Sequence, residues 1–293
     1  MSTQVQEAAL PTTSRFRNAE DYRLRAGWRI ATFLLIFYAF ALPLIFGLKA
    51  LLGFSKSSPM VIVIIAMAAT PAVYIARRWI DGKSFVSLGL QWNVRAASDL
   101  VFGFFLSGLM AGSVFAAMVM LGFIANVQMT VDLWAALSLI AIPLLTMALV
   151  GFWEELVFRG YVLQNMAEGM GMKTAIVISC LLYGLVHAMN PNAGVLSSSI
   201  IVLFGFLRIY GYLCTGQLWL SIGMHTGWNF FQATVFGFAA SGHAEEQTLV
   251  SHDVAAANWL SGGSFGPEAS VLTIPVVLGA LYVMRVWSRR HSA

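Results

Sequence analysis

The sequence predicts an all-α, polytopic integral membrane protein with about eight transmembrane helices, a cavity between them and both termini in the cytoplasm. Of its 293 residues, 59% are hydrophobic and 10% are charged, whereas about a quarter of the residues in soluble domains are charged. The hydrophobic residues form long runs, and about 20 such residues cross a bilayer. These two observations together exclude an ordinary soluble domain.

Eight apolar runs are expected to span the membrane and to form one transmembrane domain, residues 28–288. The second run contains Pro71 and the fifth is short. A proline is tolerated in a transmembrane helix when neighbouring groups satisfy the freed backbone carbonyl. The predicted spans are residues 28–52, 59–76, 100–125, 133–153, 174–189, 195–213, 218–240 and 271–287.

The positions of Lys and Arg predict the orientation of the chain. If the N-terminus is cytoplasmic, nearly all of the 17 Lys and Arg residues lie in cytoplasmic segments or at the span ends that face them; the exceptions are Lys49 and Lys56. This asymmetry satisfies the positive-inside rule. An odd number of spans would place Arg285, Arg289 and Arg290 on the opposite side. The positive balance is explained by topology and by contact with anionic lipids, and it does not indicate a nucleic-acid partner.

Polar segments flank or connect the spans. Residues 1–27 are predicted to be a disordered cytoplasmic tail because they are rich in Ser, Thr and Gln, and residues 289–293 a second cytoplasmic tail. No cleavable signal peptide is expected, since a long polar stretch precedes the first apolar run. Residues 241–269 form the longest outside loop. A solvated loop is favoured there over a surface metal site built from His243, Glu245, Glu246, His252 and Asp253.

The fourth predicted span ends at two adjacent carboxylates. Residues 133–153 carry no charge, Glu154 and Glu155 follow directly, and Arg159 comes four positions after Glu155. A carboxylate in or near hydrocarbon is costly unless it is paired, so its presence suggests a function. Residues four apart share one face of a helix. We therefore expect Arg159 to pair with Glu155 and Glu154 to remain free to face a cavity.

Two later spans carry histidines with the same four-residue spacing. Tyr183 precedes His187 by one helical turn, and His225 precedes Asn229 in the same way, while Arg208 lies in the span between them. Any one of these residues could simply join two helices through a polar contact. As a set they favour a shared polar site.

Two hydrolytic mechanisms fit these side chains. Glu154 with His187 and His225 has the composition of a zinc site that keeps an open position for water. Alternatively, Glu154 activates water as a general base with help from His187, while His225 and Asn229 donate hydrogen bonds to the oxyanion of a tetrahedral intermediate. Neither mechanism needs a nucleophilic Ser or Cys, and the sequence leaves both open.

The three spacings, in this order and on separate spans, resemble the CPBP family. This is the CAAX protease and bacteriocin-processing family of intramembrane proteases, also called Abi and often labelled metalloprotease. The matching motifs are Glu-Glu-x-x-x-Arg, aromatic-x-x-x-His and His-x-x-x-Asn, and they lie within a catalytic core of residues 133–232. One departure is Tyr183, because the family commonly has Phe at this position.

The resemblance implies an eight-helix fold whose cavity opens to the cytosol and to lipid. It also implies that the catalytic residues are Glu154, His187, His225 and Asn229, with Glu155, Arg159 and Tyr183 in support. A divalent metal such as Zn, if one takes part, would be held by Glu154, His187 and His225.

The predicted function is an intramembrane endopeptidase similar to the CAAX prenyl proteases, located in a bacterial inner membrane and open toward the cytoplasm. Its partners would be membrane lipids and a peptide or protein substrate, either lipidated or membrane-embedded. Two other functions are open. One is a catalytically silent membrane scaffold or bacteriocin self-immunity protein. The other is a proton-coupled secondary transporter that uses the buried carboxylates, which the lack of a visible inverted repeat disfavours.

Overall fold

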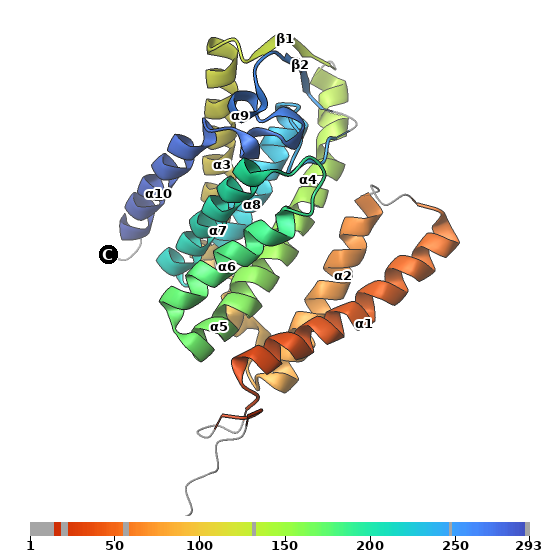
Figure 1. Ribbon diagram of the computed structural model, residues 1–293, viewed down its shortest axis with the longest axis vertical. Helices are drawn as coiled ribbons and strands as arrows, with labels where there is room; N and C mark the ends of the chain where they lie inside the picture. Colours follow the sequence, from red (N-terminus) through yellow and green to blue (C-terminus); the bar gives the residue numbers. More distant parts are fainter. Residues whose placement is uncertain (1–14, 19–22, 55–58, 131–132, 246–247, 291–293) are drawn as a thin grey trace, which may run out of the picture.

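The computed structural model describes residues 15–18, 23–54, 59–130, 133–245 and 248–290. In this part of the chain the helices form a bundle, and α1 and α2 lean away from it at one end (Figure 1). The α-helices are α1 (Ala26–Leu52), α2 (Pro59–Ile75), α3 (Val94–Met120), α4 (Leu133–Glu155), α5 (Leu163–Met170), α6 (Met172–His187), α7 (Val195–Thr215), α8 (Trp219–Asn229), α9 (Asn258–Ser261) and α10 (Thr273–Arg290). The π-helical turns are η1 (Ala76–Ile80), η3 (Leu156–Val162) and η4 (Phe230–Val235), and the 3₁₀ turns are η2 (Phe85–Leu88), η5 (Gly263–Phe265) and η6 (Pro267–Ala269).

All eight segments predicted as spans are helical over most of their length, so the protein is a mostly helical, polytopic membrane protein. Among the described residues, five helical stretches are long and apolar enough to cross a bilayer: Ala26–Leu52, Met60–Ile80, Val94–Met120, Ile140–Met170 and Val195–Thr215. Met172–His187 is a shorter apolar helix. Length and composition therefore do not establish the number eight, which stays a prediction.

The third predicted span is too long in the sequence analysis. The predicted span runs to residue 125, but α3 ends at Met120, and Gly122 turns the chain with a φ of 69°. Residues Ile124–Met129 then form strand β1, which pairs antiparallel with β2 (Val250–Val254). Because the residues remain hydrophobic from the end of α3 into β1, hydrophobicity alone does not indicate where the helix ends.

The predicted outside loop is more ordered than a solvated loop. It contains β2, α9 and two 3₁₀ turns, and it covers one end of the bundle (Figure 1). Glu268 is buried within it and accepts hydrogen bonds from Trp228 Nε1 (3.0 Å) and from the Ser241 backbone N–H (2.7 Å). Glu246, named above in the possible surface metal site, lies outside the described residues. No group of three or more His, Cys, Asp or Glu among the described residues could hold a metal ion.

The predicted tails are described only in part. Of the first tail, residues 15–18 and 23–27 are described. Arg17 and Leu24 form an isolated β-bridge, and α1 begins at Ala26, so the last two residues of the predicted disordered tail are helical. At the other end α10 continues to Arg290. The rest of both predicted tails lies outside the described residues.

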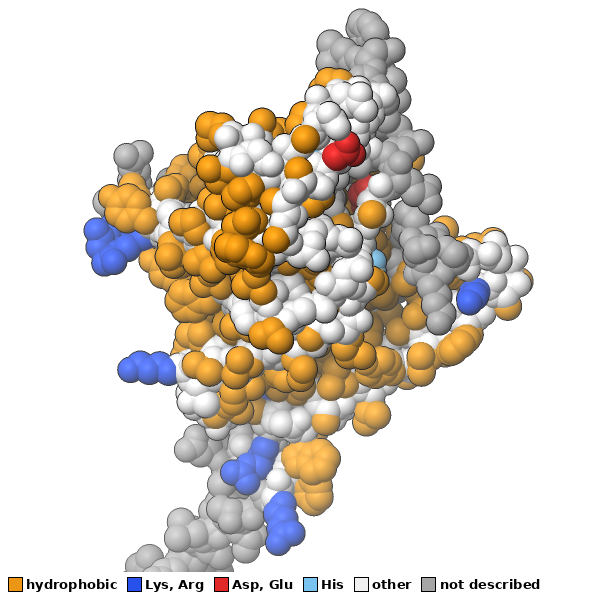
Figure 2. Space-filling view, turned by 45° about the horizontal axis from the view of Figure 1, so that its top comes forward, with side chains coloured by type: hydrophobic (Ala, Val, Ile, Leu, Met, Phe, Trp, Pro, Cys, Tyr) orange, Lys and Arg blue, Asp and Glu red, His pale blue; other side chains and the backbone are white. Residues whose placement is uncertain are grey.

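The outward faces of the helices are apolar. Leu35 on α1, Leu109 on α3 and Leu185 on α6 are all more than half exposed. Figure 2 shows hydrophobic side chains over much of the visible face and Lys and Arg toward its margins. Such a surface is suited to lipid rather than to water.

Helix α8 is held between α3 and α4 by close backbone contacts. A Cβ atom on Gly223 would lie 2.1 Å from the Leu100 carbonyl oxygen, and one on Gly227 would lie 2.3 Å from that of Phe104. Small residues allow transmembrane backbones to approach in this way. These contacts fix the position of α8, which carries His225 and Asn229.

A buried ionic network joins α1 to η1, η3 and α5. Arg29 Nη1 lies 2.9 Å from Glu168 Oε2 and 3.7 Å from Asp81 Oδ1. Arg77 pairs with Asp81 at 3.1 Å, and the Tyr161 hydroxyl donates to the same carboxylate at 3.2 Å. Because buried charges require partners, this network fixes the base of α1 against the bundle.

Candidate active site

Three of the predicted site residues converge from three helices. Glu154 lies near the end of α4, His187 is the last residue of α6, and His225 lies within α8. The Nε2 atoms of His187 and His225 are 3.9 Å and 3.8 Å from Glu154 Oε2. The structure therefore brings the carboxylate and both imidazoles into one site.

The Glu154 carboxylate is held through one of its two oxygens. The Tyr183 hydroxyl donates to Oε2 at 2.9 Å, and both imidazoles face this same oxygen. Oε1 makes no hydrogen bond with a described residue, and the side chain is 10% exposed. One oxygen is thus fixed by the protein, and the other remains available to accept a proton from water.

The partners of both histidines define their tautomers. His187 Nδ1 lies 2.9 Å from the Tyr183 carbonyl oxygen, and His225 Nδ1 lies 2.9 Å from Glu155 Oε1. Both partners can only accept, so each Nδ1 carries a hydrogen, and in the neutral form of each ring the Nε2 lone pair faces Glu154. Three acceptor atoms then face one another at distances too long for direct hydrogen bonds. A water molecule that donates to two of them would satisfy this arrangement.

Glu155 is completely buried and has a different environment from Glu154. The predicted ion pair with Arg159 forms, with Nη1 3.2 Å from Glu155 Oε1. The same oxygen accepts from His225 Nδ1, and Arg208 Nε lies 3.9 Å away. Glu155 therefore orients His225 as the carboxylate of a catalytic triad orients its imidazole.

Arg208 belongs to the same network of contacts, although the sequence analysis gave it no role. It is buried on α7 and donates from Nη1 to the Tyr183 hydroxyl. With Arg159, it balances the charges of Glu154 and Glu155. An arginine in the middle of an apolar helix was the available signal, but its partners lie on two other helices.

Asn229 lies one turn after His225 on α8 and is 8% exposed. Its side-chain amide makes no hydrogen bond with a described residue, so it is free to donate to a ligand. The π-helical turn η4 begins directly after Asn229, and η3 begins directly after Glu155. π-Helical turns frequently occur at functional sites, and here both helices change pitch beside the converging side chains.

The donor set has the composition of a zinc site, but its arrangement does not fit one. Two imidazole Nε2 atoms and a carboxylate oxygen are common zinc ligands. However, within the described ranges no set of three or more His, Cys, Asp or Glu residues is placed to hold a metal ion. We derive no chemical step through a metal.

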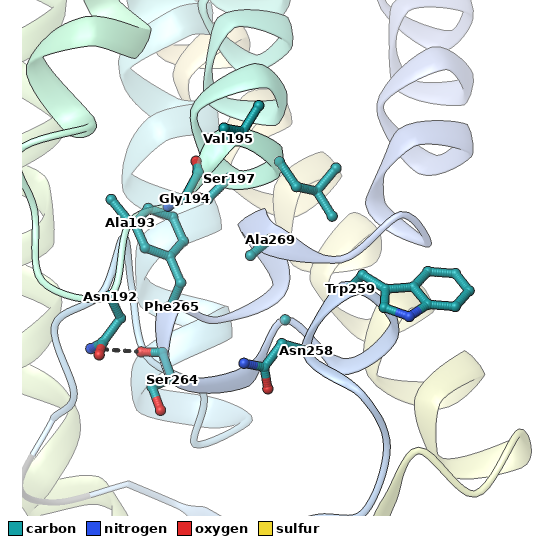
Figure 3. Close-up of a pocket in the computed structure, with 12 residues that line it drawn as sticks. Asn192, Ala193, Gly194, Val195, Ser197, Asn258, Trp259, Ser264, Phe265 and Ala269 are labelled. Atoms are coloured by element: carbon teal, nitrogen blue, oxygen red, sulfur yellow. Dashed lines mark hydrogen bonds between the residues drawn. The ribbon is translucent and has the colours of Figure 1, made fainter.

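A cavity of about 420 Å³ lies near the site but carries none of its chemistry. It is bordered by the first turn of α7 and by the segment around α9 and η5 (Figure 3). Phe265 lines this cavity and also packs against Tyr183. The residues that line it include no charged residue and no histidine, so it is unsuited to general acid–base chemistry.

The segment that carries these residues matches a known family. Residues 134–231 match the family described as type II CAAX prenyl endopeptidase Rce1-like, which confirms the resemblance drawn from the motifs. The chain is also similar to the uncharacterized protein YyaK of Bacillus subtilis (strain 168), with 34% identity over 102 residues. That alignment covers 33% of this chain and 32% of the relative, so the chain spans about a third of that protein.

Proposed function

We propose that the protein is an intramembrane endopeptidase of the CAAX prenyl protease type, which hydrolyses a peptide bond with a water molecule activated by Glu154. The observation that carries this proposal is the approach of His187 Nε2 and His225 Nε2 to one oxygen of the Glu154 carboxylate. The match of residues 134–231 to the Rce1-like endopeptidases supports it.

In the proposed reaction Glu154 Oε1 accepts a proton from water as the water oxygen attacks the peptide carbonyl. His187 orients this water. The oxyanion that forms accepts a hydrogen bond from the Asn229 amide. The neutral His225 ring has its single hydrogen on Nδ1, toward Glu155, and helps His187 to orient the water through Nε2. Glu154 then gives its proton to the leaving amine, so the carboxylate is regenerated and one water is consumed.

This mechanism needs no metal, although the metalloprotease label of the family makes a metal the natural alternative. We expect exhaustive chelation to leave the peptidase rate within about twofold of the untreated rate, because the carboxylate and imidazoles suffice for general base chemistry. Metal analysis of the chelated protein is the control. A rate that is lost on chelation and restored by Zn²⁺ would contradict the metal-free mechanism.

The proposed substrate is a lipidated or membrane-embedded peptide, which reaches the site from lipid or from the cytoplasm of a bacterial inner membrane. The apolar outer faces of the helices and the name of the matching family support this proposal. The proposed topology has eight crossings with both termini inside, since this topology places nearly all Lys and Arg on one side.

The test is cleavage of a prenylated CAAX peptide and its unprenylated counterpart in proteoliposomes, followed by mass spectrometry. We expect Glu154→Gln and His225→Ala to lower the rate by about 10³-fold or more, and Ser113→Ala, on the exposed face of α3, to leave it unchanged. Wild-type activity in both variants would disprove the assignment. A wild-type protein that binds the peptide without cleaving it would favour a silent scaffold, and proton-coupled solute uptake would favour a transporter.

A further inference from the structure

The Tyr183 hydroxyl joins Arg208 to Glu154 in a chain whose direction is fixed. Arg208 Nη1 donates to the hydroxyl oxygen, and the hydroxyl lies 2.9 Å from Glu154 Oε2. A guanidinium has no acceptor atom, and a phenol has a single proton. The phenol must therefore accept from Arg208 and donate to Glu154.

The tyrosine ring is locked in place, so the hydroxyl cannot easily turn away. Tyr183 is 1% exposed. Its ring centroid lies 4.4 Å from that of His187 and 5.1 Å from that of Phe158. Arg159 Cζ lies 4.2 Å from the Tyr183 ring centroid and forms a cation–π contact with it. Rings held by such contacts keep their polar group in a fixed position.

We propose that Tyr183 is a positioning residue for Glu154, an inference that rests on the proposed function. Its hydroxyl, polarised by Arg208, pins Oε2 and leaves Oε1 to receive the proton of the attacking water. A phenylalanine here would keep the ring contacts but would lose this donor.

The charged and titratable groups around Glu154 do not duplicate this donor. On α6, His187 faces Glu154 with an Nε2 lone pair, and His225 on α8 does the same. Arg208 on α7 acts on Glu154 through the tyrosine. The side chains of Glu155 and Arg159, next to Glu154 in the chain, are engaged with each other. Among the described residues, Tyr183 thus makes the direct hydrogen bond that holds the base.

The test is Tyr183→Phe in the full-length protein, with kcat and KM measured separately in the proteoliposome assay. We expect kcat to fall about tenfold, the loss typical of one hydrogen bond to a charged group, with KM changed less than about twofold. Tyr38→Phe, on the exposed face of α1, is the matched control and should change none of these quantities.

A second substitution keeps the experiment decisive if Tyr183→Phe folds poorly. 3-Fluorotyrosine at position 183 keeps the ring and the hydroxyl donor, so kcat should stay within about twofold of the wild-type value. Equal kcat in the wild-type, Tyr183→Phe and 3-fluorotyrosine proteins, or an equal loss in both variants, while Glu154→Gln is inactive, would overturn this inference and leave the proposed function intact. Full activity of Glu154→Gln would instead remove the proposed function itself.

Discussion

Glu154 and Glu155 are neighbours in sequence, but their side chains enter different environments. Glu154 is 10% exposed and faces two imidazole lone pairs through one oxygen. Glu155 is fully buried, and one of its oxygens is surrounded by Arg159, His225 and Arg208. Its Oε2 atom has no hydrogen-bond partner in the part of the chain that the structure describes. The first arrangement suits proton transfer. The second suits a fixed charge that orients its neighbours.

Replacement of Glu155 by Gln should therefore harm stability as well as activity. The variant leaves Arg159 and Arg208 buried with one carboxylate fewer, and breaking a buried ion pair costs about 3–5 kcal/mol. Reversible chemical unfolding in mixed micelles measures this loss. Asp253→Asn, an exposed carboxylate on β2, is the control and should change the unfolding free energy by less than about 0.5 kcal/mol. Equal stabilities for the two variants would contradict the structural role of Glu155.

The contacts of Glu155 also indicate what a sequence can predict at this scale. The pair with Arg159 was predictable because both residues lie on one helix and the spacing places them on one face. The bonds from His225 and Arg208 were not predictable, since these residues are separated from Glu155 by whole helices. The Tyr183 hydroxyl was missed as a partner of Glu154 for the same reason, although Tyr183 itself was among the supporting residues.

At the scale of elements, α8 determines the geometry of the site because it is confined on two sides. Gly223 and Gly227 bring its backbone against α3, and Gly151 on α4 would place a Cβ atom 2.6 Å from Thr226 Oγ1. The freedom of α8 to shift is therefore small, and the two residues it contributes to the site are held at fixed depth.

Gly223→Ala should displace α8. The new methyl group would lie 2.1 Å from the Leu100 carbonyl oxygen, and backbone cannot move aside as a flexible side chain can. We expect a loss of about 1–3 kcal/mol in unfolding free energy and a lower kcat, because His225 is two residues away. Gly47→Ala on α1, where no atom lies within 4 Å of the new Cβ, should be neutral or slightly stabilising. Equal behaviour of the two alanine variants would argue against this confinement of α8.

The β1–β2 pair is the element that the sequence analysis missed, and it contains a titratable group. Burial lowers the pKa of His252, whose ring centroid lies 6.2 Å from that of Phe115 and 4.5 Å from that of Phe238. A contact with the Phe236 backbone and the charge of Asp253 oppose this shift without reversing it. The folded strand pair therefore prefers the neutral ring.

The strand pair should consequently open more readily in acid. In the open state His252 titrates near its usual value of about 6.5, so below that pH the open state gains a proton that the folded state resists. Stability is retained above this range and lost as the pH falls through it. Hydrogen exchange of the two strands, corrected for intrinsic rates, should show weaker protection at pH 5.5 than at pH 8. A His252→Phe variant with the same pH dependence would assign the effect to another group.

For the molecule as a whole, several basic residues lie at helix ends that meet at one end of the bundle. Arg77 and Arg78 lie in η1, directly after α2, Arg95 lies in the first turn of α3, and Lys173 lies in that of α6. Each of these helices begins or ends near the end of the bundle marked by α5, whereas β1, β2 and α9 lie at the opposite end (Figure 1). Basic residues at one end and the ordered loop at the other are the pattern expected for a membrane protein with a cytoplasmic basic face.

This arrangement makes the location of the C-terminus the decisive test of topology. With the N-terminus inside, eight crossings return the C-terminus to the cytoplasm, whereas the five helices that qualify by length and composition alone would leave it outside. A cysteine added after Ala293, in a Cys180→Ala, Cys214→Ala background, should react with a membrane-impermeant maleimide only after permeabilisation. Two exposed positions serve as controls, because the eight-crossing and the five-crossing topologies agree on their sides. Gln91→Cys lies inside in both and should react only after permeabilisation. Ala257→Cys lies outside in both and should react at once. Labelling of the added cysteine in sealed cells would contradict an even number of crossings. It would also show that the positive-inside rule does not place Arg285 and Arg289 in the cytoplasm.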